Sequence, residues 1–286
     1  MVLLANNAFF DGAGKEEEPV LTVAGYFAGD KVCEAIEKDW LAATGGKVFH
    51  LADFGTEYCE LGSAKWTEQE RVDFLKKLGG IINRQGVYII SVSLEVSQYA
   101  AFLKVAQYKE IFGPAYSALA QLCTHTTERT LYTENRLMEK VAYTFEKGER
   151  QHEVSKAISD YEQRNPKVAE YRMLSFLPKK TTLLQPADLI SGTVRHVLLS
   201  AHSALGCLDN GRFFTRLDNF DRHYSKNGVT AAVIPPYNGR LLRYVVNKPV
   251  FANLDLITVH LEERRPEVVH KHMKQFRNQG KRKRSA

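Results

Sequence analysis

Residues 184–192 read Leu-Gln-Pro-Ala-Asp-Leu-Ile-Ser-Gly, and they place one carboxylate, that of Asp188, at the start of an otherwise apolar helix. Near the other end of the chain, the isolated acid Asp11 ends an apolar segment. A fold that joins these two segments would bring two carboxylates together, which is how a metal site is often built.

Length and composition place the chain among ordinary globular proteins. It has 286 residues, of which 44% are hydrophobic and 25% charged, enough to bury a sizeable core. No run approaches the roughly 20 apolar residues of a membrane span, and the first five residues lack the basic start and apolar length of a secretory signal. The four cysteines match no zinc-binding spacing. We therefore expect a cytoplasmic protein with free thiols and no membrane partner.

Positive charge is concentrated at the C-terminal end. The formal net charge is +6, and the run Lys281-Arg282-Lys283-Arg284 alone carries four positive charges. Such a run attracts polyanions, which makes nucleic acid the expected partner. It is also the ordinary composition of a solvated terminus, so the run alone does not decide the partner.

Predicted strands and helices alternate along most of the chain. Apolar runs at residues 7–10 and 20–27, separated by glycine and proline, predict the two strands of a hairpin. Helices are predicted at 30–43 with Asp30 as cap, from Thr67 with Glu70 in a capping box, at 114–127, at 151–164 and from 185, and strands at 87–92, 140–145 and 174–177. This order predicts an α/β domain with a mixed sheet.

The regular pattern weakens from about residue 205. Two more strands are predicted at 229–234 and 241–246, between stretches rich in glycine, asparagine and proline. We therefore divide the chain into three parts. They are an α/β domain over residues 1–204, a C-terminal extension over 205–270 whose fold the pattern does not define, and a basic, disordered tail over 271–286.

Three acids stand at edges of predicted elements. Asp11 follows one strand, Glu146 follows another, and Asp188 lies in the first turn of a helix. Carboxylate oxygens are the ligands that Mg²⁺ and Mn²⁺ prefer, and crowded carboxylates are tolerated when a cation is present. Each acid also has a structural explanation, because Asp11 suits a turn and Asp188 suits a helix N-terminus. Glu146 lies in a polar turn, in which Glu149 could be the site acid instead.

Two further groups could handle protons or phosphate. His50 and Asp53 stand three residues apart in an aromatic-flanked loop, where an imidazole could move protons, bind a phosphate or simply hydrogen-bond its neighbour. On the last predicted helix of the domain, Asp188, Gly192 and Arg195 recur on one face. Arg195 could therefore support a phosphate near Asp188, form a salt bridge or face solvent.

Motifs of several common enzyme classes are absent from the sequence. It contains no phosphate-binding P-loop, no dinucleotide-binding glycine motif, no serine nucleophile elbow and no HExxH zinc motif. ATP hydrolysis, dinucleotide chemistry, serine-esterase action and zinc proteolysis are therefore disfavoured.

The order of these pieces resembles the bacterial domain-of-unknown-function 3800 family over residues 6–201. Phe10–Gly14 stands where the family reads Asp-Glu-Ser-Gly, and Thr22–Tyr26 lies on the second strand. His50–Asp53 follows the first helix, and residues 184–192 stand for the Leu-Gln-x-Ala-Asp-Leu signature, the most specific of these marks. Members of the family look like ribonuclease H-like domains. The resemblance therefore implies a ribonuclease H-like mixed β-sheet flanked by helices, with a C-terminal extension.

The resemblance also implies roles for the acids. Asp11 and Asp188 match acidic positions of the family that, by analogy with ribonuclease H-like enzymes, bind divalent metal. Glu146 or Glu149 stands near the acid that follows the middle strand. Gly12 and Ala13 replace the family's usual Glu and Ser, so a weakened or altered site is an open alternative.

Together these observations lead us to expect a Mg²⁺- or Mn²⁺-dependent hydrolase of nucleic-acid phosphodiester bonds. Its predicted metal ligands are Asp11, Glu146 and Asp188, which are also predicted to be catalytic together with His50. His50 would assist proton transfer or hold a phosphate, and Arg195 is a predicted phosphate contact. The predicted supporting residues are Asp53, Glu149 and Gln185. Two other functions fit the same sequence. One is a catalytically inactive nucleic-acid-binding or defence-associated protein on this fold. The other is a protein-interaction module. The sequence leaves the oligomeric state open for all three functions.

Overall fold

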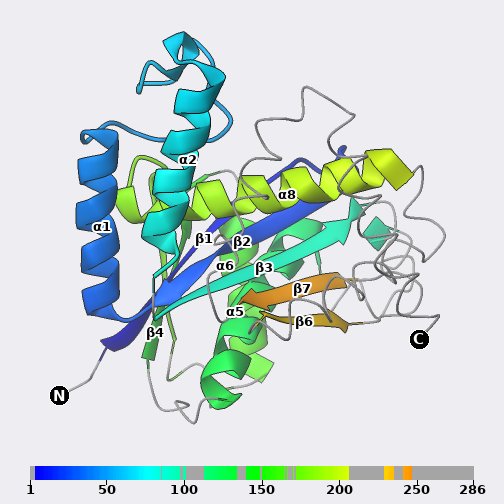
Figure 1. Ribbon diagram of the computed structural model, residues 1–286. Coiled ribbons are helices and arrows are strands. Elements are labelled where there is room, and N and C mark those ends of the chain that lie inside the picture. The colour runs from blue at the N-terminus through cyan, green and yellow to red at the C-terminus, as the bar shows by residue number, and fades with distance from the viewer. Residues whose placement is uncertain are drawn as a thin grey trace, which may run out of the picture.

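A seven-stranded sheet carries helices on both of its faces in the computed structural model (Figure 1). The structure describes residues 4–205, except 85, 97–98, 101–112, 134–139, 149, 165, 167–169 and 171, together with residues 229–234 and 241–246. The helices are α1 (Asp30–Thr44), α2 (Glu68–Ile82), α5 (Ala115–Thr133), α6 (Gln151–Arg164) and α8 (Gln185–Leu205), with short 3-10 helices η1 (Ser63–Lys65) and η2 (Thr182–Leu184). The strands are β1 (Leu4–Ala13), β2 (Val20–Ala28), β3 (Val87–Glu95), β4 (Lys140–Glu146), β5 (Arg172–Leu177), β6 (Val229–Ile234) and β7 (Leu241–Val246).

The strand order is β5-β4-β1-β2-β3-β7-β6, and the sheet is mixed. β1, β2 and β3 pair in antiparallel fashion, whereas β4 and β5 run parallel to β1. Parallel neighbours need a crossover connection, and α5 and α6 supply it before β4 and β5. The predicted α/β class with a mixed sheet flanked by helices is therefore confirmed.

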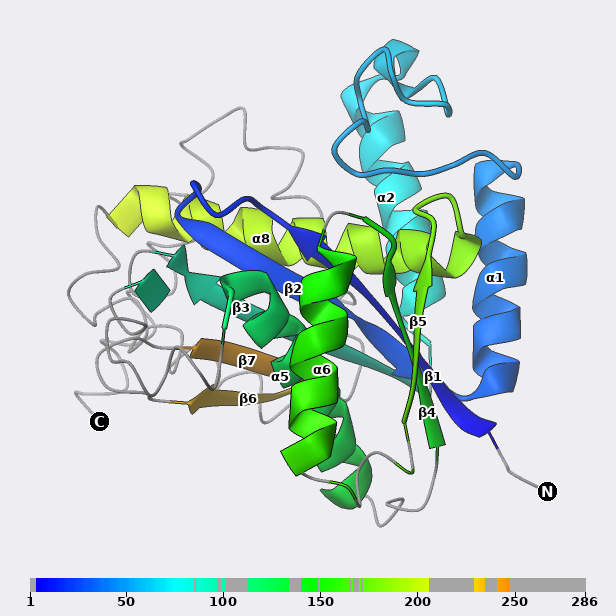
Figure 2. The same cartoon turned by 180° about the vertical axis from the view of Figure 1, so that it is seen from behind.

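Alternating side chains of the central strands fill two separate cores. Phe10 of β1 packs with residues of α5 and α6 on one face, whereas Phe9 packs with residues of α1, α2 and α8 on the other. β2 is buried along its whole length, as expected for a strand covered on both faces. Figure 1 shows α8 lying across one face of the sheet, and Figure 2 shows α6 on the opposite face.

Local sequence signals explain the start of α2 but not the start of α1. Thr67 and Glu70 form the predicted capping box, in which each side chain accepts a hydrogen bond from the other's backbone N–H. Asp30, predicted as the cap of α1, is instead its first residue, and Gly29 is the N-cap. The Asp30 carboxylate accepts a hydrogen bond from Asn7 Nδ2 at 2.5 Å, a contact with β1.

The other predicted elements are all present, with small changes at their ends. α5 continues to Thr133, beyond the predicted end at residue 127. The predicted strands β6 and β7 form a hairpin, and β7 pairs with β3 at the edge of the sheet. The boundary near residue 205 stays a prediction, and residues 271–286 lie outside the described residues. None of the helices in the described ranges is both long and apolar enough to cross a membrane.

We expect Gly25→Ala to destabilise the protein, because a Cβ on Gly25 would lie 1.8 Å from the backbone oxygen of Phe9 on β1. Forcing an atom into a packed core costs about 1–3 kcal/mol or more. Gly80 on α2 is a matched control, because a Cβ there meets nothing within 4 Å. Gly80→Ala should raise the free energy of unfolding by about 0.5–1 kcal/mol. Urea denaturation measures both changes, and equal effects would contradict the close approach of β1 and β2.

Candidate functional site

Two acids lie side by side where the pairing of β1 with β4 ends. Asp11, predicted to follow the strand, lies within β1, which continues to Ala13 beside β2, and Glu146 is the last residue of β4. The register pairs Phe10 with Phe145, so Asp11 and Glu146 follow at matching positions. Adjacent strands are about 4.8 Å apart, and successive side chains point to opposite faces. Because Phe10 and Phe145 both face α5 and α6, the two carboxylates face the side of the sheet that α8 covers.

The start of α8 brings a third carboxylate to this edge of the sheet. Asp188 lies in the first turn of α8, and Ser191, one turn later, donates a hydrogen bond to Asp11 Oδ2 at 3.5 Å. The charges of both Asp188 and Glu146 act on Asp11. The structure thus places the three acids that the sequence analysis selected at one edge of the sheet.

We call Asp11, Glu146 and Asp188 the acid cluster, and the surroundings of Asp11 oppose its ionisation. Its side chain is buried, with 4% of its surface exposed. Burial, the charge of Asp188 and the neighbouring Glu146 together raise the pKa of Asp11 well above its usual range. Among the described residues, no hydrogen bond of normal geometry reaches Asp11 Oδ1, although the backbone N–H of Gly12 acts to lower the pKa of Asp11. Such an oxygen is stabilised either by a proton or by a cation.

Asp188 is better compensated than Asp11. Burial raises the pKa of Asp188, but His50, the backbone N–H of Leu51 and Lys179 all act in the opposite direction. The Leu51 N–H donates to Asp188 Oδ2 at 2.6 Å. The carboxylate of Asp188 is therefore oriented by a loop that is distant from it in sequence.

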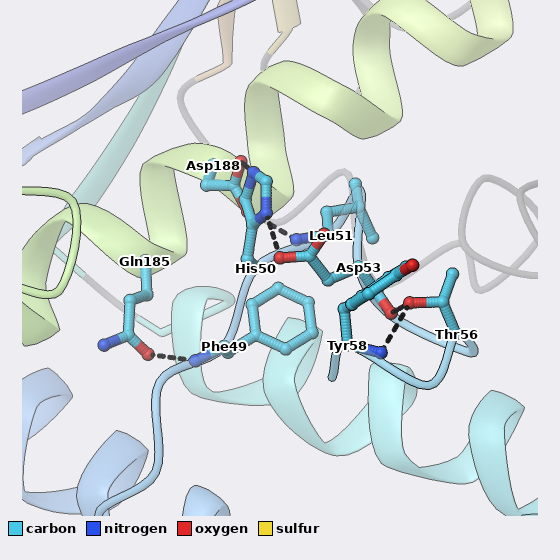
Figure 3. Close-up of polar contacts among 8 residues, drawn as sticks. All are labelled: Phe49, His50, Leu51, Asp53, Thr56, Tyr58, Gln185 and Asp188. Carbon is cyan, nitrogen blue, oxygen red and sulfur yellow. Dashed lines mark hydrogen bonds and ion pairs between the residues drawn. The ribbon is translucent and has the colours of Figure 1, made fainter. Parts of the chain in front are cut away.

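His50 lies between two carboxylates (Figure 3). Its Nδ1 donates to Asp53 Oδ2 at 2.7 Å, and its Nε2 lies 3.6 Å from Asp188 Oδ1. The bond to Asp53 fixes the orientation of the ring and turns Nε2 toward the acid cluster. The predicted pair of His50 and Asp53 is thus formed, and it is joined to Asp188.

Gln185, predicted as a supporting residue, holds the loop that carries His50. Its Oε1 accepts hydrogen bonds from the Trp40 indole N–H and from the Phe49 backbone N–H, both at 2.9 Å. All three groups are buried. One amide oxygen therefore connects α1, the loop after α1 and the start of α8, and Figure 3 shows how this places His50 beside Asp188.

Gly192 and Arg195, predicted to share a face of α8 with Asp188, have different neighbours. A Cβ on Gly192 would lie 2.5 Å from the side chain of Leu51, so Gly192 leaves room for the loop. Arg195 lies about 10 Å along the helix from Asp188, at 1.5 Å per residue. Its guanidinium forms a 2.8 Å ion pair with Glu18 in the turn between β1 and β2. The structure thus contains the salt bridge, and a phosphate contact by Arg195 stays a prediction.

Tyr116 of α5 occupies the space beside Gly12. A Cβ on Gly12 would lie 2.1 Å from Tyr116 Cε2 and 2.9 Å from its hydroxyl oxygen. The Arg150 guanidinium lies over the same ring, 4.8 Å from its centroid. A tyrosine ring therefore fills the space in which the resemblance would place the side chain of a second acid.

Several residues of the site lacked a sequence signal. Lys179 and Tyr116 belong to no motif, and only the fold brings them to the acid cluster. Ser191 stands three residues after Asp188, a helical spacing that could have identified it. Glu149, the alternative to Glu146, lies outside the described residues.

No protein-family model matches the sequence, and no curated protein matches it. Within the described ranges, no three His, Cys, Asp or Glu side chains are grouped as a ready metal-ligand set. The functional interpretation therefore depends on the chemistry of the acid cluster itself.

The metal-free protein should lose stability as the pH rises. Because the folded state keeps a proton on Asp11 above the ordinary carboxyl pKa of about 3.9, it binds more protons than the unfolded chain, and the free energy of unfolding falls with pH. The loss ends once the pH exceeds the raised pKa. Asp11→Asn should flatten this dependence and stabilise the metal-free protein at pH 8. Urea denaturation between pH 5 and 8 checks this, and a wild-type profile that matches the variant would refute it.

Gln185→Met should destabilise the protein at nearly constant volume. It leaves the indole N–H of Trp40 and the backbone N–H of Phe49 buried without an acceptor, at roughly 1–3 kcal/mol for each donor. In a Trp40→Phe background the same change should cost less, because one of the donors is already gone. Equal costs in the two backgrounds, measured by urea denaturation, would show that the shared oxygen does not couple α1 to the loop.

Proposed function

We propose that the protein is a divalent-metal-dependent hydrolase of nucleic-acid phosphodiester bonds, built on a ribonuclease H-like fold. The observation that carries the proposal is the acid cluster, in which a buried carboxylate with an orphaned oxygen stands beside two further carboxylates. The sheet also supports it. Three antiparallel strands followed by two parallel ones, in the order β3-β2-β1-β4-β5, are compatible with a ribonuclease H-like arrangement.

The donor set suits Mg²⁺ or Mn²⁺. The acid cluster offers only hard carboxylate oxygens, which favour these ions over softer metals. Asp11, Glu146 and Asp188 would hold the ion, and its charge would remove the cost of keeping the carboxylates ionised together. Once bound, such an ion supplies an activated water and stabilises the leaving oxygen.

The remaining residues of the site orient groups and handle protons. His50 presents Nε2 toward Asp188 because Asp53 holds Nδ1, so the imidazole is placed to take up or release a proton, or to bind a phosphate oxygen. The loop that carries His50 is fixed by Gln185. The basic run at residues 281–284 would add affinity that depends on salt but not on base sequence.

One observation favours a second function. Because Tyr116 fills the space beside Gly12, the chain lacks the carboxylate and the hydroxyl that Gly12 and Ala13 replace. A protein that binds nucleic acid on the same fold without cleaving it accounts for this loss. The two functions differ in metal-dependent turnover.

Calorimetric titration with Mn²⁺ tests the proposed site without a choice of substrate. We expect the wild type to bind, and Asp11→Asn and Asp188→Asn to lose binding, because each removes a charged ligand from the acid cluster. Asp73→Asn is a matched control, because Asp73 is exposed on α2, where it pairs with Lys76.

The result decides between the functions. If the wild type and the control bind Mn²⁺, incubation with single- and double-stranded DNA and RNA then measures cleavage. Binding of metal and nucleic acid without cleavage would favour the inactive protein. Failure of the wild type to bind Mn²⁺ would refute the metal site, provided that all variants unfold with wild-type cooperativity.

A further inference from the structure

A two-lysine turn lies at the edge of the sheet that carries the acid cluster. Leu177, the last residue of β5, pairs with Glu146, and the backbone N–H of Lys147 donates to Leu177 O at 2.8 Å. The chain then turns over residues 178–181, where the Thr181 N–H donates to Pro178 O at 2.8 Å. Lys179 and Lys180 occupy the two middle positions of this turn.

The turn is fixed to the start of α8. The Leu184 N–H donates to the carbonyl of Thr181 at 3.0 Å, and Gln185 Nε2 donates to the carbonyl of Lys180 at 3.3 Å. Gln185 stands one turn before Asp188 on α8. The backbone that carries the two lysines is therefore held in a defined position relative to the acid cluster.

The two lysines differ in their surroundings. The side chain of Lys179 is half-buried and its charge acts on Asp188, whereas Lys180 is exposed. In the described part of the chain, the Lys179 ammonium forms no salt bridge. An ammonium that forms no such ion pair, on a turn fixed at the edge of the sheet where the acid cluster lies, is suited to bind an anion that approaches the cluster.

We infer that Lys179 binds a backbone phosphate of the nucleic-acid substrate and holds the phosphodiester against the acid cluster. The inference rests on the proposed function. A polyanion that approaches three carboxylates needs compensating positive charge close by, and a lysine ammonium is a compact phosphate-binding group. The turn supplies this charge from the side of β5, while His50 supplies an imidazole from the loop after α1.

Lys179→Gln tests the inference, with Lys180→Gln as the matched control from the same turn and Lys179→Arg as the conservative variant. We measure the binding of fluorescent single- and double-stranded oligonucleotides over a range of salt concentrations. Lys179→Gln should bind roughly tenfold or more weakly, as for loss of a charged hydrogen bond. It should also lower the slope of log K against log salt by about 0.7–0.9, the value for one phosphate contact. Lys180→Gln should change neither quantity as much, and Lys179→Arg should keep both.

Cleavage kinetics and unfolding complete the test. Lys179→Gln should raise KM more than it lowers kcat, because the phosphate contact exists before the transition state, and both glutamine variants should still unfold cooperatively. If the wild type binds and cleaves nucleic acid but the two glutamine variants behave alike, the role of Lys179 is refuted and the proposed function stands. If the wild type neither binds nor cleaves nucleic acid, the proposed function fails and this inference fails with it.

Discussion

The arrangement of the site depends on one amide oxygen, that of Gln185. It accepts two buried hydrogen bonds, one from the indole of Trp40 and one from the backbone of Phe49. Neither donor could remain buried without an acceptor, so the bonds tie α1 and the following loop to the first turn of α8. The next two residues of the loop, His50 and Leu51, then meet Asp188 as a consequence of this attachment. The surroundings of Asp188 are thus set by a contact that takes no part in its chemistry.

The buried acid cluster lowers the stability of the folded protein, whereas its hydrophobic cores raise it. Asp11 is covered by a packed sheet and by α8, where an ionised carboxylate is costly. Asp188 is relieved by an N–H donor and by nearby positive groups, but no hydrogen bond of normal geometry reaches Asp11 Oδ1 among the described residues. The two hydrophobic cores on either side of the sheet offset this cost. Buried carboxylates with a shifted pKa are common where a site is preorganised for a charged ligand.

Elements whose signals are local could be predicted from the sequence. Thr67 and Glu70 gave the start of α2, and the apolar runs at 229–234 and 241–246 gave both late strands. Asp11 and Glu146 lie close together because parallel strands end at a common edge, and Asp188 reaches that edge from the first turn of α8. Contacts that depend on distant segments were not predictable. Asp30 is held by Asn7 instead of capping α1, Arg195 pairs with Glu18, and Lys179 reaches the cluster through a turn without a motif.

The close approach of Tyr116 to Gly12 also limits which substitutions position 12 can accept. Any side chain at position 12 must first displace a buried aromatic ring. An acid at that position would therefore require the Tyr116 ring to move, and it would add a new buried charge. A smaller residue at position 116 would have to come first, and it would leave a cavity beside Arg150. The ring of Tyr116 therefore opposes the gain of a further carboxylate at position 12.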